Sequence, residues 1–179
     1  MKIKIGEMEM EAIELLKTRR SCRSFKKEQI KDIELQTILE CGLNAPSAMN
    51  KQDSKIIVIQ DKKIIKELSA LNAQIMNKDI DPFYGAPTVC LILVPKSNHN
   101  GKQDGALVIG AMQDGAYALN IGSCWINRCK EMLEIDAGFE YLKKWHLEDY
   151  VGVGCCVLGY PESQLPEKQI KEDRVIFVC

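Results

Sequence analysis

Few residues of this sequence are suited to hydrolytic or zinc-dependent chemistry. The chain has only two histidines, His99 and His146, and it contains neither a Gly-x-Ser-x-Gly nor a His-Glu-x-x-His motif. A hydrolytic triad and a zinc-protease site are therefore not predicted. The chain also lacks a Walker-type loop and a Gly-x-Gly-x-x-Gly motif at the start of a helix. Gly152-Val153-Gly154 lies within an apolar run and is a poor nucleotide fingerprint.

Long hydrophobic runs and an excess of one charge are missing as well. No apolar run approaches the ~20 residues that span a bilayer, and residues 1–10 are too charged for the core of a signal peptide. The formal net charge is −1, and Lys and Arg alternate with Glu and Asp. We therefore expect a cytoplasmic protein with no membrane or nucleic-acid partner. The length of 179 residues predicts a single domain, 1–179.

Cysteine is plentiful, but the pattern of a metal site is absent. None of the eight cysteines forms a Cys-x-x-Cys pair, and few histidines are available to join them, so no metal site is expected. Cys90, Cys155 and Cys156 lie inside apolar runs, where a free thiol behaves as a small hydrophobe. Inert thiols in a reducing compartment are favoured over a structural metal or a disulfide framework.

Hydrophobic periodicity predicts four helices and four strands. The helices are expected at 7–18, 31–43, 62–71 and 105–122, and the strands at 54–60, 87–95, 151–160 and 175–178. Residues 74–82 and 97–104 are expected to be connections. Because this order gives no regular βαβ series, we expect an α+β fold in which helices flank a mixed sheet. The last strand follows a long polar tail, so a neighbouring subunit is within its reach.

The first candidate binding segment is a basic cluster after the first predicted helix: Arg19, Arg20, Ser21, Cys22 and Arg23. Guanidinium groups present planar forks of donors that match the oxygens of a phosphate. The alternative is a solvated basic patch at a helix end, where positive charge suits the helix dipole. The residues alone leave both interpretations open.

Two further segments have binding potential. Residues 45–52 combine a proline with a hydroxyl and two carboxamides, groups that match the edge of a heteroaromatic ring, although an ordinary loop has the same composition. Residues 119–126 follow the long predicted helix, where Gly122 could cap the helix and bring backbone close to a planar ligand. Cys124 and Trp125 fit a plain core position equally well. Binding groups without an evident acid, base or nucleophile are typical of an enzyme whose cofactor performs the reaction.

Together these segments resemble the nitroreductase family of FMN-dependent oxidoreductases, especially its shorter members. The resemblance is carried by five stretches that occur in the family's order. They are Arg19-Arg20-Ser21-x-Arg23-x-Phe25, Ala45-Pro-Ser-Ala-x-Asn50-x-Gln52, Gly85-Ala86-Pro87, Gly122-Ser123-Cys124-Trp125-Ile126 and Leu158-Gly159-Tyr160-Pro161.

The resemblance implies a domain-swapped homodimer with FMN bound at its interface. It assigns the phosphate and ribityl chain to Arg19, Arg20, Ser21 and Arg23. It assigns Pro46, Ser47, Ala48 and Asn50 to the site of the partner subunit, and the backbone of Ile121, Gly122 and Ser123 to the flavin ring. The tail departs from the family pattern, because Ile170 stands where an arginine is usual. The tail residue that contacts the FMN phosphate would then be Lys168, Lys171 or Arg174.

The implied reaction is hydride transfer in two steps, with no catalytic side chain. NADH or NADPH would reduce the flavin at N5, and a nitroaromatic, a quinone or a related electron-poor acceptor would then reoxidise it. One alternative within the same fold is an enzyme that acts on an enone or a free flavin. An alternative from another class is a flavin-binding or regulatory protein with little turnover. A thiol-redox protein is a further alternative from another class.

Overall fold

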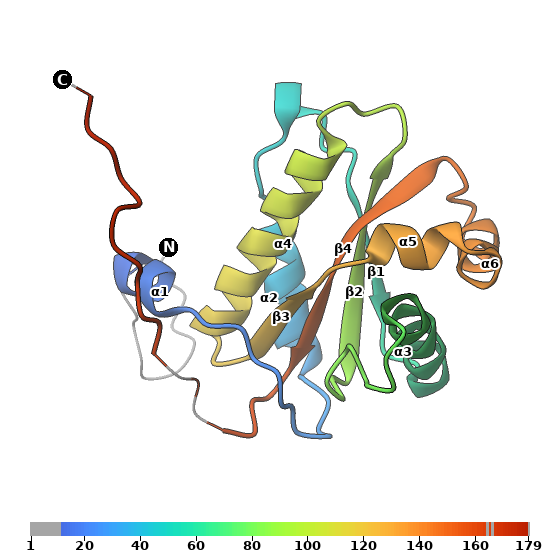
Figure 1. Cartoon of the computed structure of the whole chain (residues 1–179), viewed down its shortest axis with the longest axis horizontal. Coiled ribbons are helices and arrows are strands. Elements are labelled where there is room, and N and C mark those ends of the chain that lie inside the picture. Colours follow the sequence, from blue (N-terminus) through green and yellow to red (C-terminus); the bar gives the residue numbers. More distant parts are fainter. Residues whose placement is uncertain (1–11, 164, 166, 179) are drawn as a thin grey trace.

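The computed structural model describes residues 12–163, 165 and 167–178. Its elements in chain order are α1 (Ala12–Thr18), α2 (Asp32–Leu43), the 3-10 turn η1 (Ala48–Asn50), β1 (Lys55–Ile59), α3 (Lys62–Met76), β2 (Thr88–Pro95), α4 (Gly101–Ala118), β3 (Gly122–Ile126), α5 (Cys129–Glu134), α6 (Asp136–Lys144) and β4 (Tyr150–Gly159). Figure 1 shows the strands at the centre and helices on both sides of them.

The four strands form one sheet in the order β1-β2-β4-β3. All three pairings are antiparallel. β2 and β4 lie in the middle, and every residue of β2 except Pro95 is buried, as expected for a strand covered on both faces. The predicted α+β class is confirmed. The sheet formed by the described residues is antiparallel, however, and a mixed sheet would need a further strand.

Each face of the sheet carries its own hydrophobic core. On one face, α2 and α4 pack over Cys90, Ile92 and Cys156. On the other, α3, α5 and α6 cover Leu91 and Cys155. Successive residues of a strand point to opposite faces, which explains why neighbouring cysteines of β4 enter different cores. Figure 1 shows α4 and α3 on opposite sides of the sheet.

Close packing of α4 depends on two of its glycines. A Cβ at Gly105 would lie 2.7 Å from Val153 Cγ2, and a Cβ at Gly115 would lie 2.7 Å from Cys41 Sγ. Each glycine therefore lets the helix approach its neighbour more closely than a larger residue would. The result is a long helix fixed against both β4 and α2.

The end of the long helix differs from its prediction. α4 begins at Gly101 and ends at Ala118, and Gly122 opens strand β3 instead of capping the helix. Asn120 takes the left-handed conformation in the turn between them. The predicted helix 105–122 has the observed length of 18 residues but is displaced by four residues, since residues 101–104 of the predicted connection are helical and residues 119–122 are not. Sequence periodicity cannot separate a short buried strand from the end of a buried helix.

The boundaries of other helices and strands also differ from their predicted positions. α3 continues to Met76, so the connection predicted at 74–82 is shorter than expected, and β3, α5 and α6 were not predicted. Of the helix predicted at 7–18, residues 12–18 form α1, and residues 7–11 lie outside the described residues. Among the helices that the structure describes, none is long and apolar enough to cross a membrane.

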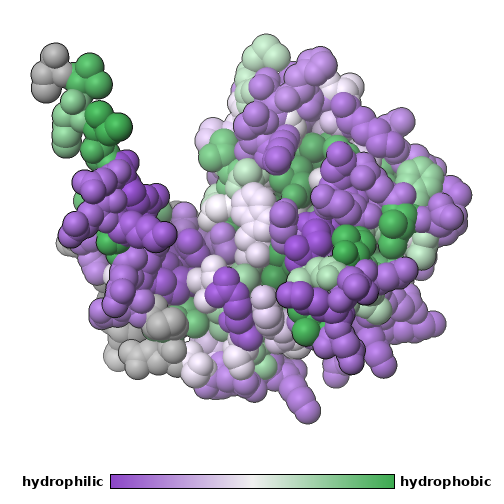
Figure 2. Space-filling model, in the orientation of Figure 1, coloured by the Kyte–Doolittle hydropathy of each residue, from purple (hydrophilic) through white to green (hydrophobic). Residues whose placement is uncertain are grey.

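The predicted strand 175–178 is wrong for a single subunit. These residues pair with no strand in the described part of the chain. Their side chains, from Val175 to Val178, are 71–93% exposed, although four consecutive apolar residues favour a partner. The tail extends away from the sheet (Figure 1), and its apolar end stands outside the body of the protein (Figure 2).

The seven described cysteines are free, and the thiols in the two cores should be chemically inert. Burial raises the pKa of Cys90 to about 12, and it raises the pKa of Cys156 as well. Hydrogen bonding with Cys129, followed by burial, raises that of Cys155. A rise from 9.0 to about 12 lowers the thiolate fraction at pH 8 roughly a thousandfold, and the thiolate is the reactive form.

We expect iodoacetamide at pH 8 to leave Cys90, Cys155 and Cys156 unmodified in the folded protein, as read by peptide mass spectrometry. The same peptides should be labelled fully after unfolding in urea, which serves as the control. Rapid labelling of any of the three in the native state would contradict this assignment and would revive a thiol-redox role.

Candidate functional site

The basic cluster lies directly against the start of β3. The backbone N–H of Cys22 donates to Ser123 O at 2.8 Å, and the Cys22 side chain is buried. A Cβ at Gly122 would lie 2.8 Å from both Cβ and Sγ of Cys22, so only glycine permits this approach without displacement. The first and third candidate segments are therefore one structural unit, although about a hundred residues separate them.

Two arginines of the cluster have polar atoms without a partner. Arg19 Nε lies 3.3 Å from Asp114 Oδ1 on α4, and Arg20 Nη1 donates to the carbonyls of Lys17 and Arg19 at 3.0 and 2.6 Å. Arg19 Nη1 and Arg20 Nε are buried and find no hydrogen-bond partner among the described residues. Buried donors without an acceptor cost free energy. An anion at this position would relieve that cost.

The electrostatics of the cluster follow from these contacts. Burial raises the pKa of the Asp114 carboxyl, and the charge of Arg19 opposes the rise. Burial likewise raises the pKa of the Cys124 thiol, against the opposing effects of Arg23 and of a hydrogen bond with Ser21. Arg23 itself is exposed. Asp114 pairs with Arg19, and neither Arg20 nor Arg23 forms a salt bridge with a carboxylate among the described residues.

The second segment forms a tight, internally bonded turn. The Gln52 N–H donates to Ser47 Oγ at 3.0 Å, and Gln52 Nε2 donates to Asn50 Oδ1 at 2.8 Å. Met49, Asn50 and Gln52 all have φ between 52° and 54°, in the left-handed region that costs energy for residues other than glycine. The Ala48 N–H donates to Asp104 Oδ1 at 2.9 Å. The turn is thereby fixed to the first part of α4.

Within one subunit the second segment lies far from the basic cluster. Asp104 holds the turn, and Asp114 contacts Arg19. Ten residues of helix separate these two aspartates, a distance of about 15 Å along the axis. Pro46, Ser47, Ala48 and Asn50 therefore do not meet Arg19 in the same chain. Figure 1 shows η1 and the segment after α1 at opposite ends of α4.

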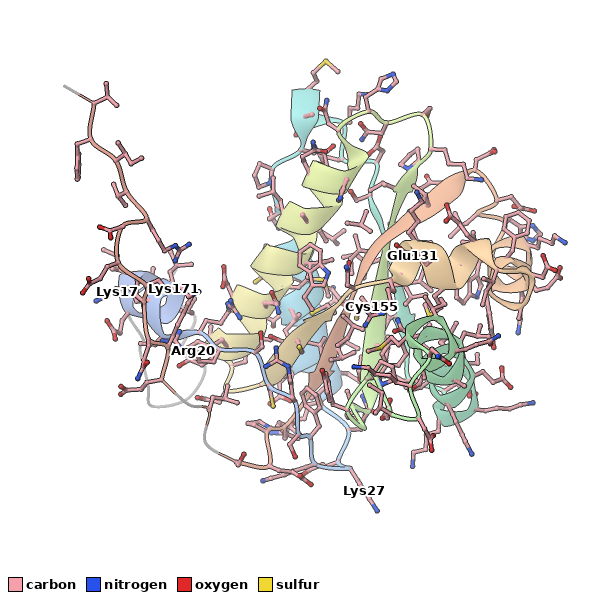
Figure 3. All side chains as sticks on the ribbon, viewed as in Figure 1. Lys17, Arg20, Lys27, Glu131, Cys155 and Lys171 are labelled. Carbon is pink, nitrogen blue, oxygen red and sulfur yellow. The ribbon has the colours of Figure 1, made fainter. Side chains whose placement is uncertain are left out.

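The tail residues Lys168, Lys171 and Arg174 are exposed, and no side chain of the described residues forms an ion pair with them. Lys171 lies on the same side of the protein as Lys17 and Arg20, away from Glu131 on α5 (Figure 3). Ile170, at the position where an arginine was expected, is 75% exposed. The structure fixes none of the three cations on a ligand position.

Sequence reasoning missed the two aspartates of α4. Asp104 is buried and holds the turn at Ala48, and Asp114 pairs with Arg19. The available signal was a pair of carboxylates ten positions apart in an Ala- and Gly-rich helix. Acidic residues on a largely apolar helix are expensive to bury unless they have partners.

Comparison with known proteins finds nitroreductases and an FMN reductase. The sequence model of the Nitroreductase family matches residues 16–90, which include the first two candidate segments. An NADH dehydrogenase/NAD(P)H nitroreductase of Archaeoglobus fulgidus is 37% identical over 59 residues, or 33% of this chain and 34% of that protein. An FMN reductase [NAD(P)H] of Bacillus subtilis is 38% identical over 61 residues, or 34% of this chain and 24% of that protein. The matches thus span about a third or less of these relatives.

Solved structures extend the similarity to nearly the whole fold. A nitroreductase with bound FMN from Bacteroides fragilis superposes with a TM-score of 0.86 at 27% identity, covering 95% of this chain and all of that one (100%). An FMN-dependent nitroreductase from Clostridium difficile has a TM-score of 0.81 at 29% identity, with 94% and 99% covered.

Proposed function

We propose that this chain, a nitroreductase-family protein by sequence over residues 16–90 and by fold, is an NAD(P)H-dependent oxidoreductase that uses FMN. The observation that carries the proposal is the pair of buried, partnerless donors on Arg19 and Arg20. They lie in the segment matched by the family model and next to a close glycine contact with β3.

The residues present fit the phosphate and ring of FMN. A phosphate dianion supplies acceptors for Arg19 Nη1 and Arg20 Nε, and Ser21 adds a hydroxyl donor. Arg23, exposed at the end of the cluster, adds a third positive charge. The backbone of Ile121, Gly122 and Ser123 lies beside this cluster, joined to it by the hydrogen bond from Cys22 N to Ser123 O, and is the part of the chain proposed to face the flavin ring. Lys168, Lys171 and Arg174 are the tail cations proposed to add to this charge.

The remaining half of the site is proposed to come from a second subunit. Because Pro46, Ser47, Ala48 and Asn50 lie near the other end of α4, they meet a cofactor at Arg19 only if two chains pack around that helix in opposite directions. α4 has a suitable face: Leu107 is 48% exposed, and nothing within 4 Å would contact a Cβ at Gly110. The exposed apolar residues 175–178 supply a segment that could extend a neighbour's sheet. In a homodimer of this kind, the partner's residues 175–178 would supply the further strand that the predicted mixed sheet needs.

The chemistry belongs to the cofactor, and the chain's residues hold and polarise it. Bound FMN would supply the hydride-transfer chemistry between NADH or NADPH and an electron-poor acceptor. Arg19, Arg20 and Arg23 anchor the anionic end, while Asp114 fixes the direction of the Arg19 guanidinium. Neither histidine lies in these segments, and no side chain is assigned a proton-transfer role. Nitroaromatics and quinones are the proposed acceptors, and the cytoplasm is the proposed location.

The reaction order gives a direct test of function. Donor and acceptor are proposed to use the same open face of the ring in turn, so initial rates with varied NADH or NADPH should give parallel double-reciprocal lines at several acceptor concentrations. The panel should include a nitroaromatic, a quinone, an enone and free flavin. Turnover with only the enone or free flavin would show that nitroaromatics and quinones are not the acceptors of this enzyme. Bound FMN that neither nicotinamide reduces would leave a flavin-binding protein without this activity.

Loss of Arg19 should weaken FMN binding far more than loss of Lys168. We expect Arg19→Ala to raise the Kd for FMN about 10- to 100-fold, the value of a charge-assisted hydrogen bond of roughly 1.5–3 kcal/mol. Lys168→Ala, at an exposed position, should change it less than about threefold. Fluorescence titration of the apoprotein measures both.

The double variant Arg19→Ala/Asp114→Asn is the control for the carboxylate that Arg19 leaves behind. If Asp114 alone caused the loss, this variant would recover FMN binding. The proposal that Arg19 contributes more to FMN affinity than Lys168 also fails if Lys168→Ala raises the Kd more.

A further inference from the structure

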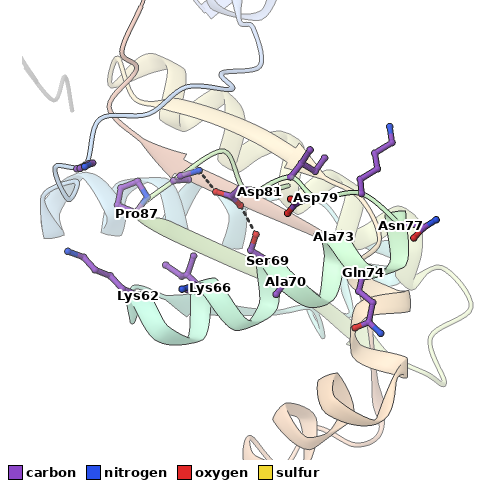
Figure 4. A pocket seen from close by; sticks show the side chains of 16 residues that line it. Lys62, Lys66, Ser69, Ala70, Ala73, Gln74, Asn77, Asp79, Asp81 and Pro87 are labelled. Atoms are coloured by element: carbon purple, nitrogen blue, oxygen red, sulfur yellow. Dashed lines mark hydrogen bonds between the residues drawn. The ribbon is translucent and has the colours of Figure 1, made fainter.

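A second cleft lies on the opposite face of the sheet from α4. It has a volume of about 890 Å³ and is formed by α3 and the loop that leads into β2. Figure 4 shows side chains from both walls facing this space. Pockets of about 300–1,000 Å³ are the usual size for small organic ligands. None of the residues proposed to hold FMN lines this cleft.

Both walls of the cleft carry small apolar residues. Ala70 and Ala73 from α3 face Ala86 and Pro87 from the following loop, and Ile65 adds a larger aliphatic side chain. The short apolar side chains leave room between the two walls, and Ser69, Gln74 and Asn77 add polar groups to the lining. A flat or compact apolar body can bury area against such a wall.

The rim of the cleft carries several unpaired cations. Lys62 and Lys66 come from α3, and Lys27 comes from the segment after the basic cluster. None of them has a carboxylate within salt-bridge distance among the described residues. Figure 4 shows Lys62 and Lys66 on neighbouring turns at the same end of α3. Like charges four residues apart destabilise an isolated helix, so an anion between these side chains is favourable.

Two carboxylates, Asp79 and Asp81, also line the cleft, and neither forms a salt bridge with the four lysines of its lining among the described residues. Asp81 accepts hydrogen bonds from Ser69 Oγ at 2.6 Å, Phe83 N at 2.9 Å and Gly85 N at 2.6 Å. Both of its oxygens are therefore occupied in fixing the loop against α3. This network makes the wall at Gly85 and Ala86 a preformed surface.

We propose that the cleft is a second ligand site, for a small aromatic carboxylate. The ring lies against Ala70, Ala73 and Pro87, and the carboxylate lies between the ammonium groups of Lys62 and Lys66. The site is separate from the proposed FMN site and does not depend on it. An apolar wall gives affinity for the ring, and the unpaired lysines select the anion over a neutral analogue.

Calorimetric titration of the chain of residues 1–179 with 2-naphthoate and its neutral isostere 2-naphthamide tests this site. The naphthoate should bind about tenfold more tightly than the amide. Lys62→Gln/Lys66→Gln should remove that preference by weakening naphthoate alone. Lys63→Gln, a neighbouring lysine outside the cleft lining, is the matched control and should leave both affinities unchanged.

A blocking variant separates this cleft from any other binding place. Ala70 is exposed at the cleft wall, so Ala70→Trp should fill the space without disturbing the core, and it should abolish binding of both ligands. Naphthoate binding that survives both Ala70→Trp and the lysine double variant would place the ligand elsewhere and overturn the proposal, as would no binding at all. FMN titration of the same variants should match the unmodified protein, so failure at one site is distinguishable from failure at the other.

Discussion

The backbone hydrogen bond from Cys22 to Ser123, at 2.8 Å, joins the basic cluster to the sheet. It forms because Gly122 has no side chain, and the buried Cys22 occupies the space that a Cβ would need. Without this approach Arg19 and Arg20 would belong to a short exposed helix end, since α1 buries none of its own residues. With it, two arginines have donors buried beside the edge of β3.

Close packing of the same kind is found at Gly159, the residue of β4 that lies next to Gly122. Gly122 pairs with Gly159 of β4, and a Cβ at Gly159 would lie 2.7 Å from Pro87 Cδ and 3.1 Å from Phe25 Cδ1. Four sequence stretches that are far apart in the chain therefore meet in one layer. The layer also separates the basic cluster from the cleft at Pro87, which explains how two proposed ligand sites can lie close in the fold and still use different residues.

Sequence reasoning succeeded where one strong local signal decided the structure. Strand β2, an apolar run bounded by prolines, was predicted within one residue at its start, and α2 was also placed closely. Sequence reasoning failed where tertiary contacts determine the local structure. β3 is a five-residue strand after an apolar helix, and only its pairing with β4 distinguishes it from another helical turn. The segment 175–178, predicted as a strand, has no partner within the described chain, so no single-chain property could settle its structure.

The sequence was sufficient to identify the segments of the site, but not to predict how those segments lie relative to one another. The sequence indicated Arg19, Arg20 and Gly122, and the structure brings these together. It could not indicate Asp114 as the partner of Arg19, because their contact depends on how α4 crosses the end of α1. The separation of Asn50 from Arg19 follows from the length of α4. That separation gives the physical reason for proposing a shared site.

The central claim is that one FMN site takes its cationic half from one subunit and its carboxamide half from the other. Co-expression of Arg19→Ala with Asn50→Ala tests it most directly, with bound FMN measured per protein chain. Each variant alone should lose FMN. In a mixed dimer both substitutions fall in one site and the other site is intact, so random pairing should restore about a quarter of the sites. If the two residues belong to a site within one chain, mixing restores none, and the shared-site account is wrong.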